Sequence, residues 1–287
     1  MKKLSLPISL SRLVEKLESK TDFSPVELLK IIKDANISER HLFPWADFDH
    51  PKVEGYGRKL VYTGDHFEIM VMSWAKKDYT AIHNHGYTKW GAVKVFGALE
   101  HISFQLEENH LSTLHKERLE KGEVLAVNQD LIHQMGNPTD DNILSIHIYG
   151  TPEKRSNVTE NSALYEVGKH ETQIVNGGVF YDLRNDIIVE RSPGLKSDRL
   201  TEIGHFTSLL NFYYKSNQRG AQYNKAVNYF QNRSFEGRFS LELELDSKGI
   251  LYFIELRKAR ILLELLDEST KTIDSILNEI NDIEKYS

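Results

Sequence analysis

The apolar residues near the start of the chain recur with a helical period. Between residues 9 and 20 they lie three or four positions apart, at Leu10, Leu13, Val14 and Leu17. That spacing places them on one face of an amphipathic helix. A second helix is predicted to begin at Pro25, because Ser24 suits the N-cap position and Glu27 completes a capping box ahead of an apolar run. Both helices are expected to pack on the outside of the structure that follows.

From about Lys59 the pattern changes from helical to alternating. Short runs with strand character follow, separated by turn signals: LVYT, FEIMVMS, AVKVF, LEHISFQ, HLSTLHKERL, GEVLAVN and ILSIHIY. Many short strands without helical segments between them are typical of an antiparallel sandwich or barrel. We expect such a structure over residues 56–150. Residues 151–196 are expected to extend the sheet, with a turn at Gly177 and Gly178.

Beyond residue 196 the pattern becomes helical again. The predicted helices are TEIGHFTSLLNFYYKSN, YNKAVNYFQNR and the last thirty or so residues, with a hairpin between them at FSLELELDSKGILYFIEL. Aromatic residues such as Phe212 and Tyr229 favour a separate small core, with an oligomer contact or a partner surface as alternatives. The pattern therefore divides the chain into N-terminal helices (1–50), a β domain (51–194) and a mostly helical C-terminal extension (195–287).

Composition excludes several classes of protein. The 287 residues carry a formal net charge of −6, which provides no electrostatic footprint for nucleic acid or an anionic membrane. The sequence has no apolar run of transmembrane length, and its start turns charged before a secretory segment forms. We therefore expect a cytoplasmic protein without a nucleic-acid or membrane partner. The chain has no cysteine, so any metal must be held by His, Asp or Glu.

The strongest candidate for chemistry is the stretch TAIHNHGYTKWGAVKVFG at residues 80–97. His83 and His85 lie two positions apart in what reads as a strand, so their side chains share a face and can converge on a metal ion. A His-x-His pair alone also occurs on ordinary surfaces. His133, in GEVLAVNQDLIHQMGNP, can supply a third ligand from a neighbouring strand. Three ligands on one side of a metal leave positions open for substrate and O₂.

Two motifs of the chain resemble those of the cupin superfamily. Their residues are His83, His85 and Gly97 in the first, and Gly122, His133 and Asn137 in the second. The resemblance implies a mainly β fold, the double-stranded β-helix or jelly-roll barrel. Cupins commonly supply a glutamate four or five residues after the histidine pair, where this chain has Lys89 and Trp90. A site of three histidines without that glutamate resembles the thiol dioxygenases, of which cysteine dioxygenase is the best known.

The run ILSIHIY supports this narrower resemblance. By the period of two, Ser145, His147 and Tyr149 share one face of a strand whose other face is aliphatic. Three polar side chains on one face must find hydrogen-bond partners if they are buried. Thiol dioxygenases carry a Ser-x-His-x-Tyr triad beside their iron, which implies a catalytic role for these three residues. A polar face exposed to solvent is the alternative.

Three further residues are expected at the substrate. Tyr56 and Arg58 lie upstream of the histidine pair by about the distance at which cysteine dioxygenases carry the arginine that binds the substrate carboxylate. A guanidinium pairs with a carboxylate through two parallel hydrogen bonds. Without the resemblance Arg58 reads as a surface arginine.

Some cysteine dioxygenases carry a cysteine near the histidine pair that is cross-linked to the tyrosine. By count Trp90 occupies that position here, so we expect Trp90 at the pocket.

The resemblance covers roughly residues 10–185 and implies a mononuclear non-haem Fe(II) enzyme. His83, His85 and His133 would hold the iron, and both atoms of O₂ would be added to the sulfur of a small thiol, with L-cysteine preferred, to give a sulfinic acid. An alternative substrate is 3-mercaptopropionate. That branch places its arginine after the Ser-His-Tyr strand, where Arg155 is the nearest candidate.

Two different classes of function stay open beside the thiol dioxygenase. One is a cupin enzyme with another reaction. The second is a metal-binding cupin sensor that acts through residues 195–287, and this segment is also a candidate surface for self-association.

Overall fold

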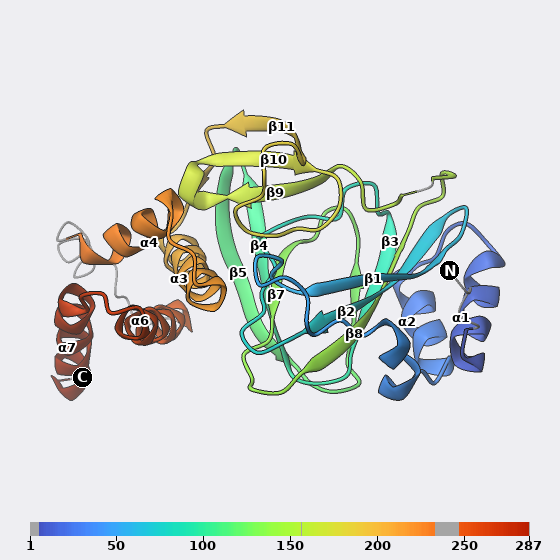
Figure 1. Ribbon diagram of the computed structural model, residues 1–287, viewed down its shortest axis with the longest axis horizontal. Coiled ribbons are helices and arrows are strands. Elements are labelled where there is room, and N and C mark those ends of the chain that lie inside the picture. The colour runs from blue at the N-terminus through green and yellow to red at the C-terminus, as the bar shows by residue number, and fades with distance from the viewer. Residues whose placement is uncertain (1–5, 156, 233–246, 287) are drawn as a thin grey trace. The chain divides into compact units, whose positions relative to one another are not determined.

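The computed structural model describes residues 6–155, 157–232 and 247–286. They form two compact units. Unit 1 contains residues 1–105, 114–165 and 172–192, and unit 2 contains residues 106–113, 166–171 and 193–287. Helices occur toward both ends of the chain, with the strands between them in sequence (Figure 1). The expected order of helices, strands and helices is confirmed. The division into segments 1–50, 51–194 and 195–287 stays a prediction.

An antiparallel five-stranded sheet dominates unit 1. In spatial order its strands are β1 (Gly57–Thr63), β2 (Phe67–Trp74), β8 (Ile143–Gly150), β3 (Trp90–Val95) and β6 (Val124–Val127). β2 and β8 pair without interruption from Phe67 opposite Gly150 to Trp74 opposite Ile143. This continuous register aligns alternate residues of the two strands on common faces.

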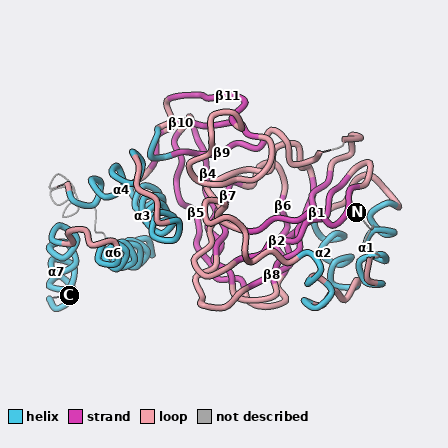
Figure 2. Tube along the Cα trace, in the orientation of Figure 1, coloured by secondary structure: helices cyan, strands magenta, loops and turns pink. Residues whose placement is uncertain are grey.

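Two smaller sheets contain the other strands. The first has the order β12 (Lys196–Ser197), β5 (His110–Leu119), β4 (Leu99–Glu107) and β7 (Ile132–Gly136). The second has the order β11 (Ile188–Pro193), β10 (Glu171–Val175) and β9 (Ser162–Glu166). Figure 2 shows these strands in magenta, joined by loops in pink. Strand β7 carries His133, and it pairs with β4 so that Ser103 lies opposite His133.

The N-terminal helices α1 (Ile8–Glu18) and α2 (Pro25–Asp34) cover one face of the five-stranded sheet (Figure 1). The predicted capping box is present, since the Ser24 hydroxyl accepts from the Glu27 backbone and the Glu27 carboxylate accepts from the Ser24 backbone. Short 3-10 turns, η1 (Glu39–His41) and η2 (Phe43–Trp45), follow the helices. Leu10 and Leu13 of α1 are completely buried, and burial of such a side chain contributes about 1.5–3 kcal/mol.

The sheet residues beneath these helices occupy alternate positions. They are Phe67, Ile69 and Val71 in β2, Trp90 and Ala92 in β3, and Leu144, Ile146 and Ile148 in β8. Successive side chains of a strand point to opposite faces. Ser145, His147 and Tyr149 therefore lie on the face away from the helices, in agreement with the alternation read from the sequence.

The histidine pair does not lie in the regular strand that the sequence predicted. His83 instead forms isolated bridges with His133 and Leu164, in the connection between β2 and β3. Its backbone exchanges hydrogen bonds of 3.0 and 2.9 Å with His133. The extended run ends at Gly86, which adopts φ +53° and approaches the backbone of Glu160 so closely that a Cβ would lie 2.0 Å from its carbonyl oxygen. Because the chain turns at Gly86, the extended segment that contains the histidine pair is only a few residues long.

Unit 2 is mostly helical in its described residues. Its elements include η3 (Val167–Lys169), α3 (Arg199–Ser216), α4 (Ala221–Gln231), α6 (Ser247–Leu265) and α7 (Lys271–Tyr286). The predicted aromatic core is present: Tyr213 and Phe230 are buried, and the rings of Phe206 and Tyr229 stack with centroids 4.3 Å apart.

The predicted hairpin over residues 239–256 is wrong in its second half. Residues 239–246 lie outside the described part of the chain, and residues from Ser247 onward form helix α6. The residues that α6 buries include Leu256, Ala259, Leu262 and Leu263, which recur at three- and four-residue intervals. Packing of this helical face decided the conformation where the short apolar run alone suited either a strand or a helix.

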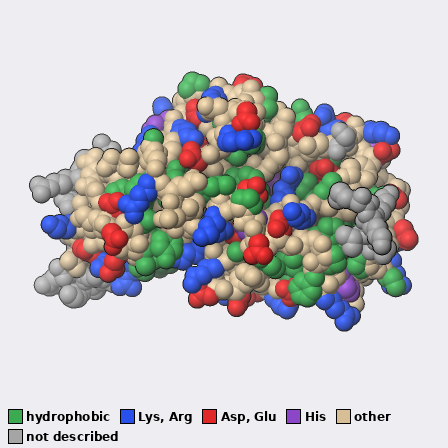
Figure 3. Space-filling view, viewed as in Figure 1, with side chains coloured by type: hydrophobic (Ala, Val, Ile, Leu, Met, Phe, Trp, Pro, Cys, Tyr) green, Lys and Arg blue, Asp and Glu red, His purple; other side chains and the backbone are tan. Residues whose placement is uncertain are grey.

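No helix in the described ranges combines the length and the hydropathy needed to cross a bilayer. On the molecular face shown in Figure 3, basic and acidic side chains are interspersed.

Acid should destabilise the protein through His205, a buried residue of α3 whose Nε2 accepts a 3.1 Å hydrogen bond from the Gly168 N–H. Burial lowers the pKa of His205 to about 3, so the unfolded chain binds the proton first as the pH falls below about 6.5. The free energy of unfolding should therefore decrease as the pH falls, by up to about 1.4 kcal/mol per pH unit from this residue.

Urea unfolding at pH 7.0 and 5.5 measures this loss. His205→Gln should show a smaller difference between the two pH values than the wild type, whereas His110→Gln, at an exposed position, should not. Equal pH dependence in the wild type and His205→Gln would contradict the assignment.

Candidate metal centre and substrate pocket

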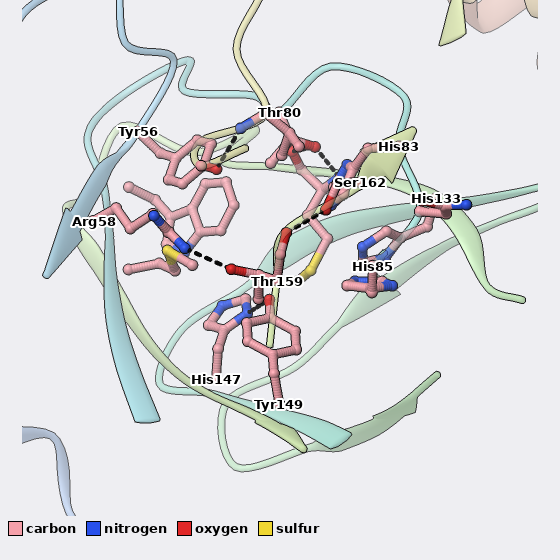
Figure 4. Close-up of a pocket in the computed structure, with 16 residues that line it drawn as sticks. Tyr56, Arg58, Thr80, His83, His85, His133, His147, Tyr149, Thr159 and Ser162 are labelled. Carbon is pink, nitrogen blue, oxygen red and sulfur yellow. Dashed lines mark hydrogen bonds between the residues drawn. The ribbon is translucent and has the colours of Figure 1, made fainter. Parts of the chain in front are cut away.

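Three buried histidines from two separate segments of the chain converge at one point. Ring nitrogens of His83, His85 and His133 all lie within 4.8 Å of one another. The backbone pairing between His83 and His133 brings the two segments together, and the turn after His85 directs its ring to the same place (Figure 4). The three-histidine group expected from the sequence is confirmed as a candidate metal site.

The hydrogen bonds around these rings suit metal binding. Nδ1 of His83 lies 2.9 Å from the Ala81 carbonyl oxygen, and Nδ1 of His85 lies 3.2 Å from the Asn128 carbonyl oxygen. A carbonyl oxygen only accepts, so each Nδ1 carries the proton and each Nε2 keeps its lone pair. Nε2 of His85 is buried without a hydrogen-bond partner, as expected of an atom that binds a metal.

Burial also keeps the three rings neutral. It lowers the pKa of His83 to about 4 and lowers the pKa values of His85 and His133 well below the usual range, and neighbouring histidines add to the effect in all three. A metal binds the neutral imidazole and competes with the proton for the same nitrogen. The donor set of three neutral imidazoles therefore fits a divalent transition metal such as Fe(II).

Strand β8 supplies a hydrogen-bonded chain beside the histidines. Nε1 of Trp74 donates to the Ser145 hydroxyl at 2.8 Å, Ser145 Oγ lies 2.7 Å from Nε2 of His147, and Nδ1 of His147 lies 2.8 Å from the Tyr149 hydroxyl. Trp74 can only donate. In the tautomer of His147 that is protonated at Nδ1, the Ser145 hydroxyl donates to Nε2 and the N–H at Nδ1 donates to the oxygen of Tyr149.

This direction of donation leaves the hydroxyl proton of Tyr149 to point into the pocket. Burial lowers the pKa of His147 to about 3 and raises the pKa of Tyr149, so His147 is neutral and Tyr149 keeps its proton. The rings of Tyr149 and His85 lie 5.5 Å apart between centroids. Tyr149 thus places a protonated hydroxyl next to the three-histidine group.

Arg58 faces the same pocket from β1. Its Nη2 donates to the Thr159 hydroxyl at 3.0 Å, and that hydroxyl in turn donates to the Asn157 side chain. Figure 4 shows Arg58 across the pocket from the three histidines. One of the five guanidinium N–H groups is used by Thr159, and the cationic group adds a site for an anion to a pocket of neutral imidazoles.

Tyr56 shapes the wall next to Arg58. Its ring stacks on Trp74 with centroids 5.2 Å apart, and its hydroxyl accepts a 3.2 Å hydrogen bond from the Val179 N–H. Val179 also lines the pocket. Tyr56, next to the strand that carries Arg58, is therefore tied to a second segment that lines the pocket.

The pocket brings together most of the residues expected at the site. Those that line it directly are Tyr56, Arg58, His83, His85, His133, His147 and Tyr149. Ser145 lies behind His147 and acts through it.

Thr159 and Trp74 line the pocket and hydrogen-bond to expected site residues, but neither was expected from the sequence. Thr159 belongs to a loop without a motif, so no local signal marks it. Trp74 could have been found, because the alternation of β2 places it on the same face as Met72, another lining residue.

Trp90 does not lie at the pocket, which corrects the expectation from residue counting. Its indole Nε1 donates to the Thr21 carbonyl at 2.9 Å, and its ring packs edge-on against Phe23, 4.8 Å away. The register pairs Trp90 with Gly150 and Gly91 with Tyr149. The residue opposite the tyrosine is therefore Gly91, and a shift of one position in a strand reverses the face.

Comparison with known proteins identifies a family model and several solved structures. The model for cysteine dioxygenase type I matches residues 4–161. An uncharacterized conserved protein with a double-stranded β-helix domain from Klebsiella pneumoniae shares 13% identity, with 50% of this chain and 96% of that chain covered and a TM-score of 0.30. Oxalate decarboxylase from Lactobacillus farciminis shares 11% identity, with 35% of this chain and 30% of that chain covered and a TM-score of 0.30.

The cupin domain of Schizosaccharomyces pombe Cnp3 shares 9% identity, with 37% of this chain and 67% of that chain covered and a TM-score of 0.29. All three TM-scores are low, and the family model provides the stronger evidence. With the curled sheets of the structure, that match confirms the predicted double-stranded β-helix of the cupins.

Replacing Trp90 should affect stability and not the pocket. Trp90→Phe removes the hydrogen bond to Thr21 and leaves a small cavity, so urea unfolding should show a loss of about 1–3 kcal/mol. Zinc binding at the histidines should be unchanged. Met72→Leu, a volume-conserving change in the pocket wall, is the matched control and should cost less than about 1.5 kcal/mol. Weaker zinc binding by Trp90→Phe at unchanged stability would contradict this placement.

Proposed function

The chain belongs to the cysteine dioxygenase type I family, and from this premise we propose that it is a mononuclear non-haem Fe(II) thiol dioxygenase acting on L-cysteine. The reaction adds both atoms of O₂ to the sulfur, R–SH + O₂ → R–SO₂H. The observation that carries the proposal is the arrangement of one pocket, in which three neutral imidazoles, the Arg58 guanidinium and the Tyr149 hydroxyl face the same space.

His83, His85 and His133 are the proposed iron ligands, because their Nε2 atoms are the ones that the hydrogen bonds at Nδ1 leave for a metal. Ferrous iron bound there supplies positions for a thiolate and O₂ and the electrons that activate O₂. The three ligands bring no negative charge, so a thiolate substrate complements the site. The neutral ligand set therefore favours a substrate that binds as a thiolate anion over a substrate that binds without charge.

Arg58 is the proposed binding group for the substrate carboxylate. A guanidinium can form two parallel hydrogen bonds with a carboxylate, and such charge-assisted bonds are about twice as strong as neutral ones. Thr159 orients the guanidinium by accepting from Nη2. An amino-acid thiol bound in this way has its sulfur and its carboxylate held at opposite sides of the pocket, which positions the sulfur for oxidation.

Tyr149 is proposed to hydrogen-bond to the reacting atoms. In the tautomer of His147 protonated at Nδ1, the Tyr149 oxygen accepts from that ring and its own proton is directed to the pocket. The raised pKa keeps that proton in place at neutral pH. A donor with a fixed direction can stabilise negative charge that develops on oxygen or sulfur during the reaction. Ser145 and His147 position the donor and do not contact the substrate themselves.

L-cysteine is preferred to 3-mercaptopropionate because of the two arginines. Arg155, the candidate for the 3-mercaptopropionate branch, does not line the pocket, and its guanidinium lies over the Tyr87 ring at 3.7 Å. Among the described residues that line the pocket, Arg58 is the one arginine or lysine. A cytoplasmic location and self-association through residues 195–287 stay predictions of the sequence.

Oxygen uptake by protein loaded anaerobically with Fe(II) tests the reaction. L-Cysteine and 3-mercaptopropionate are supplied in parallel, and the product is identified by mass spectrometry. We expect cysteine sulfinic acid formed in a 1:1 ratio with O₂ consumed, as the reaction above requires, and slower turnover of 3-mercaptopropionate. Stoichiometric iron binding without sulfinate from either thiol would refute the proposed reaction and favour a metal-binding sensor.

Arg58→Ala should raise the KM for L-cysteine by about 10–100-fold, because the variant loses charge-assisted hydrogen bonds worth about 1.5–3 kcal/mol. The matched control is Arg155→Ala, which should leave the KM within about twofold. Cysteamine, which lacks the carboxylate, should be oxidised with the same KM by the wild type and Arg58→Ala. A larger effect of Arg155→Ala than of Arg58→Ala would reverse the substrate assignment.

A further inference from the structure

The third histidine of the metal site differs from the first two in what supports it. The Nδ1 atoms of His83 and His85 face backbone carbonyl oxygens. Nδ1 of His133 instead faces another side chain, His101, whose Nε2 lies 3.1 Å away. His101 comes from β4 and is 3% exposed. A side chain in this position can be changed by mutation, which a backbone carbonyl cannot.

His101 is in turn held by a carboxylate. Its Nδ1 lies 2.9 Å from Oε1 of Glu117, in the neighbouring strand β5. The rings of His101 and His133 meet edge to face, with centroids 5.1 Å apart. The three side chains thus form a continuous series of hydrogen bonds from the metal site, through a buried ring, to a carboxylate that is 39% exposed.

The carboxylate determines where the protons lie. An ionised carboxylate accepts hydrogen bonds and cannot donate, so the proton on His101 is at Nδ1. In a neutral His101 the second nitrogen, Nε2, is then an acceptor, and the proton between the two rings belongs to Nδ1 of His133. That assignment leaves Nε2 of His133 unprotonated on the side of the metal site. The opposite arrangement would put a proton on the nitrogen that has to bind the metal.

We infer that His101 and Glu117 are positioning residues that fix the ring orientation and the metal-binding tautomer of His133. A carboxylate that acts through an imidazole also increases the electron donation of the ligand. In a site with three neutral ligands, this support places negative charge behind one of them. The inference rests on the three-histidine metal site and is independent of the proposed thiol reaction.

A neighbouring ion pair on the same two strands provides a comparison for His101 and Glu117. On the same two strands, Glu100 of β4 and Lys116 of β5 form an ion pair of 3.0 Å, one residue away from His101 and Glu117. The hydrogen bond to His133 comes from His101, and the adjacent pair joins the same two strands through Glu100 and Lys116. Glu100→Gln is therefore a matched control that removes a carboxylate between the same strands and leaves the series of hydrogen bonds intact.

Two measurements, both made without thiol or O₂, test the inference. Nitrogen-15 NMR of the metal-free protein reports the tautomer of His133, and competition with a chromophoric chelator reports the affinity for zinc at fixed pH. We expect the Nδ1–H tautomer in the wild type. His101→Leu should shift His133 toward the Nε2–H tautomer and weaken zinc binding by about 10–100-fold. His101→Gln retains an acceptor and should recover part of the affinity.

Glu117→Gln should weaken zinc binding less than His101→Leu, because the exposed carboxylate is screened by solvent, and Glu100→Gln should match the wild type. Glu117→Gln leaves both rings in place and decides the question if His101→Leu fails to fold. The inference is overturned by an Nε2–H tautomer of His133 in the wild type, or by equal zinc affinity in Glu117→Gln and Glu100→Gln. Failure to form sulfinate would affect neither result.

Discussion

A buried imidazole has two nitrogens, and whatever bonds to one of them decides what the second can do. This constraint organises the whole pocket. At His83 and His85 a backbone carbonyl accepts a hydrogen bond from the Nδ1–H, which leaves Nε2 for a metal. At His147 the two ring nitrogens face the hydroxyls of Ser145 and Tyr149, so neither nitrogen is left for a metal. The same side-chain type thus serves as a ligand or as a positioning group according to its partner.

The two faces of the five-stranded sheet make this arrangement possible. One face is apolar and packs against the N-terminal helices, with residues such as Ile146 and Ile148 completely buried. The opposite face presents the polar residues of β8 to the pocket. Because the period of a strand is two, the packing that buries the aliphatic residues also determines the direction of the polar ones. Stability and site geometry therefore depend on the same register.

The arrangement of charge explains the chemistry that the pocket suits. Burial keeps the three candidate ligands neutral, and Arg58 is a cationic group on the opposite side. A substrate with an anionic sulfur and a carboxylate matches both ends. Membership of the cysteine dioxygenase type I family agrees with this match, and the Glu117 carboxylate on the far side of His101 provides negative charge where the three histidines bring none.

The sequence by itself determined the features that depend on local spacing. The alternation in ILSIHIY placed the polar triad on one face, and the spacing of His83 and His85 with a later His133 indicated a three-histidine site. Tertiary structure decided what depends on pairing between distant segments. The position opposite Tyr149 is set by a register that counting along the chain misjudged by one residue. His101 likewise reads as one polar residue in a strand, since its partners are close only after the sheet has formed.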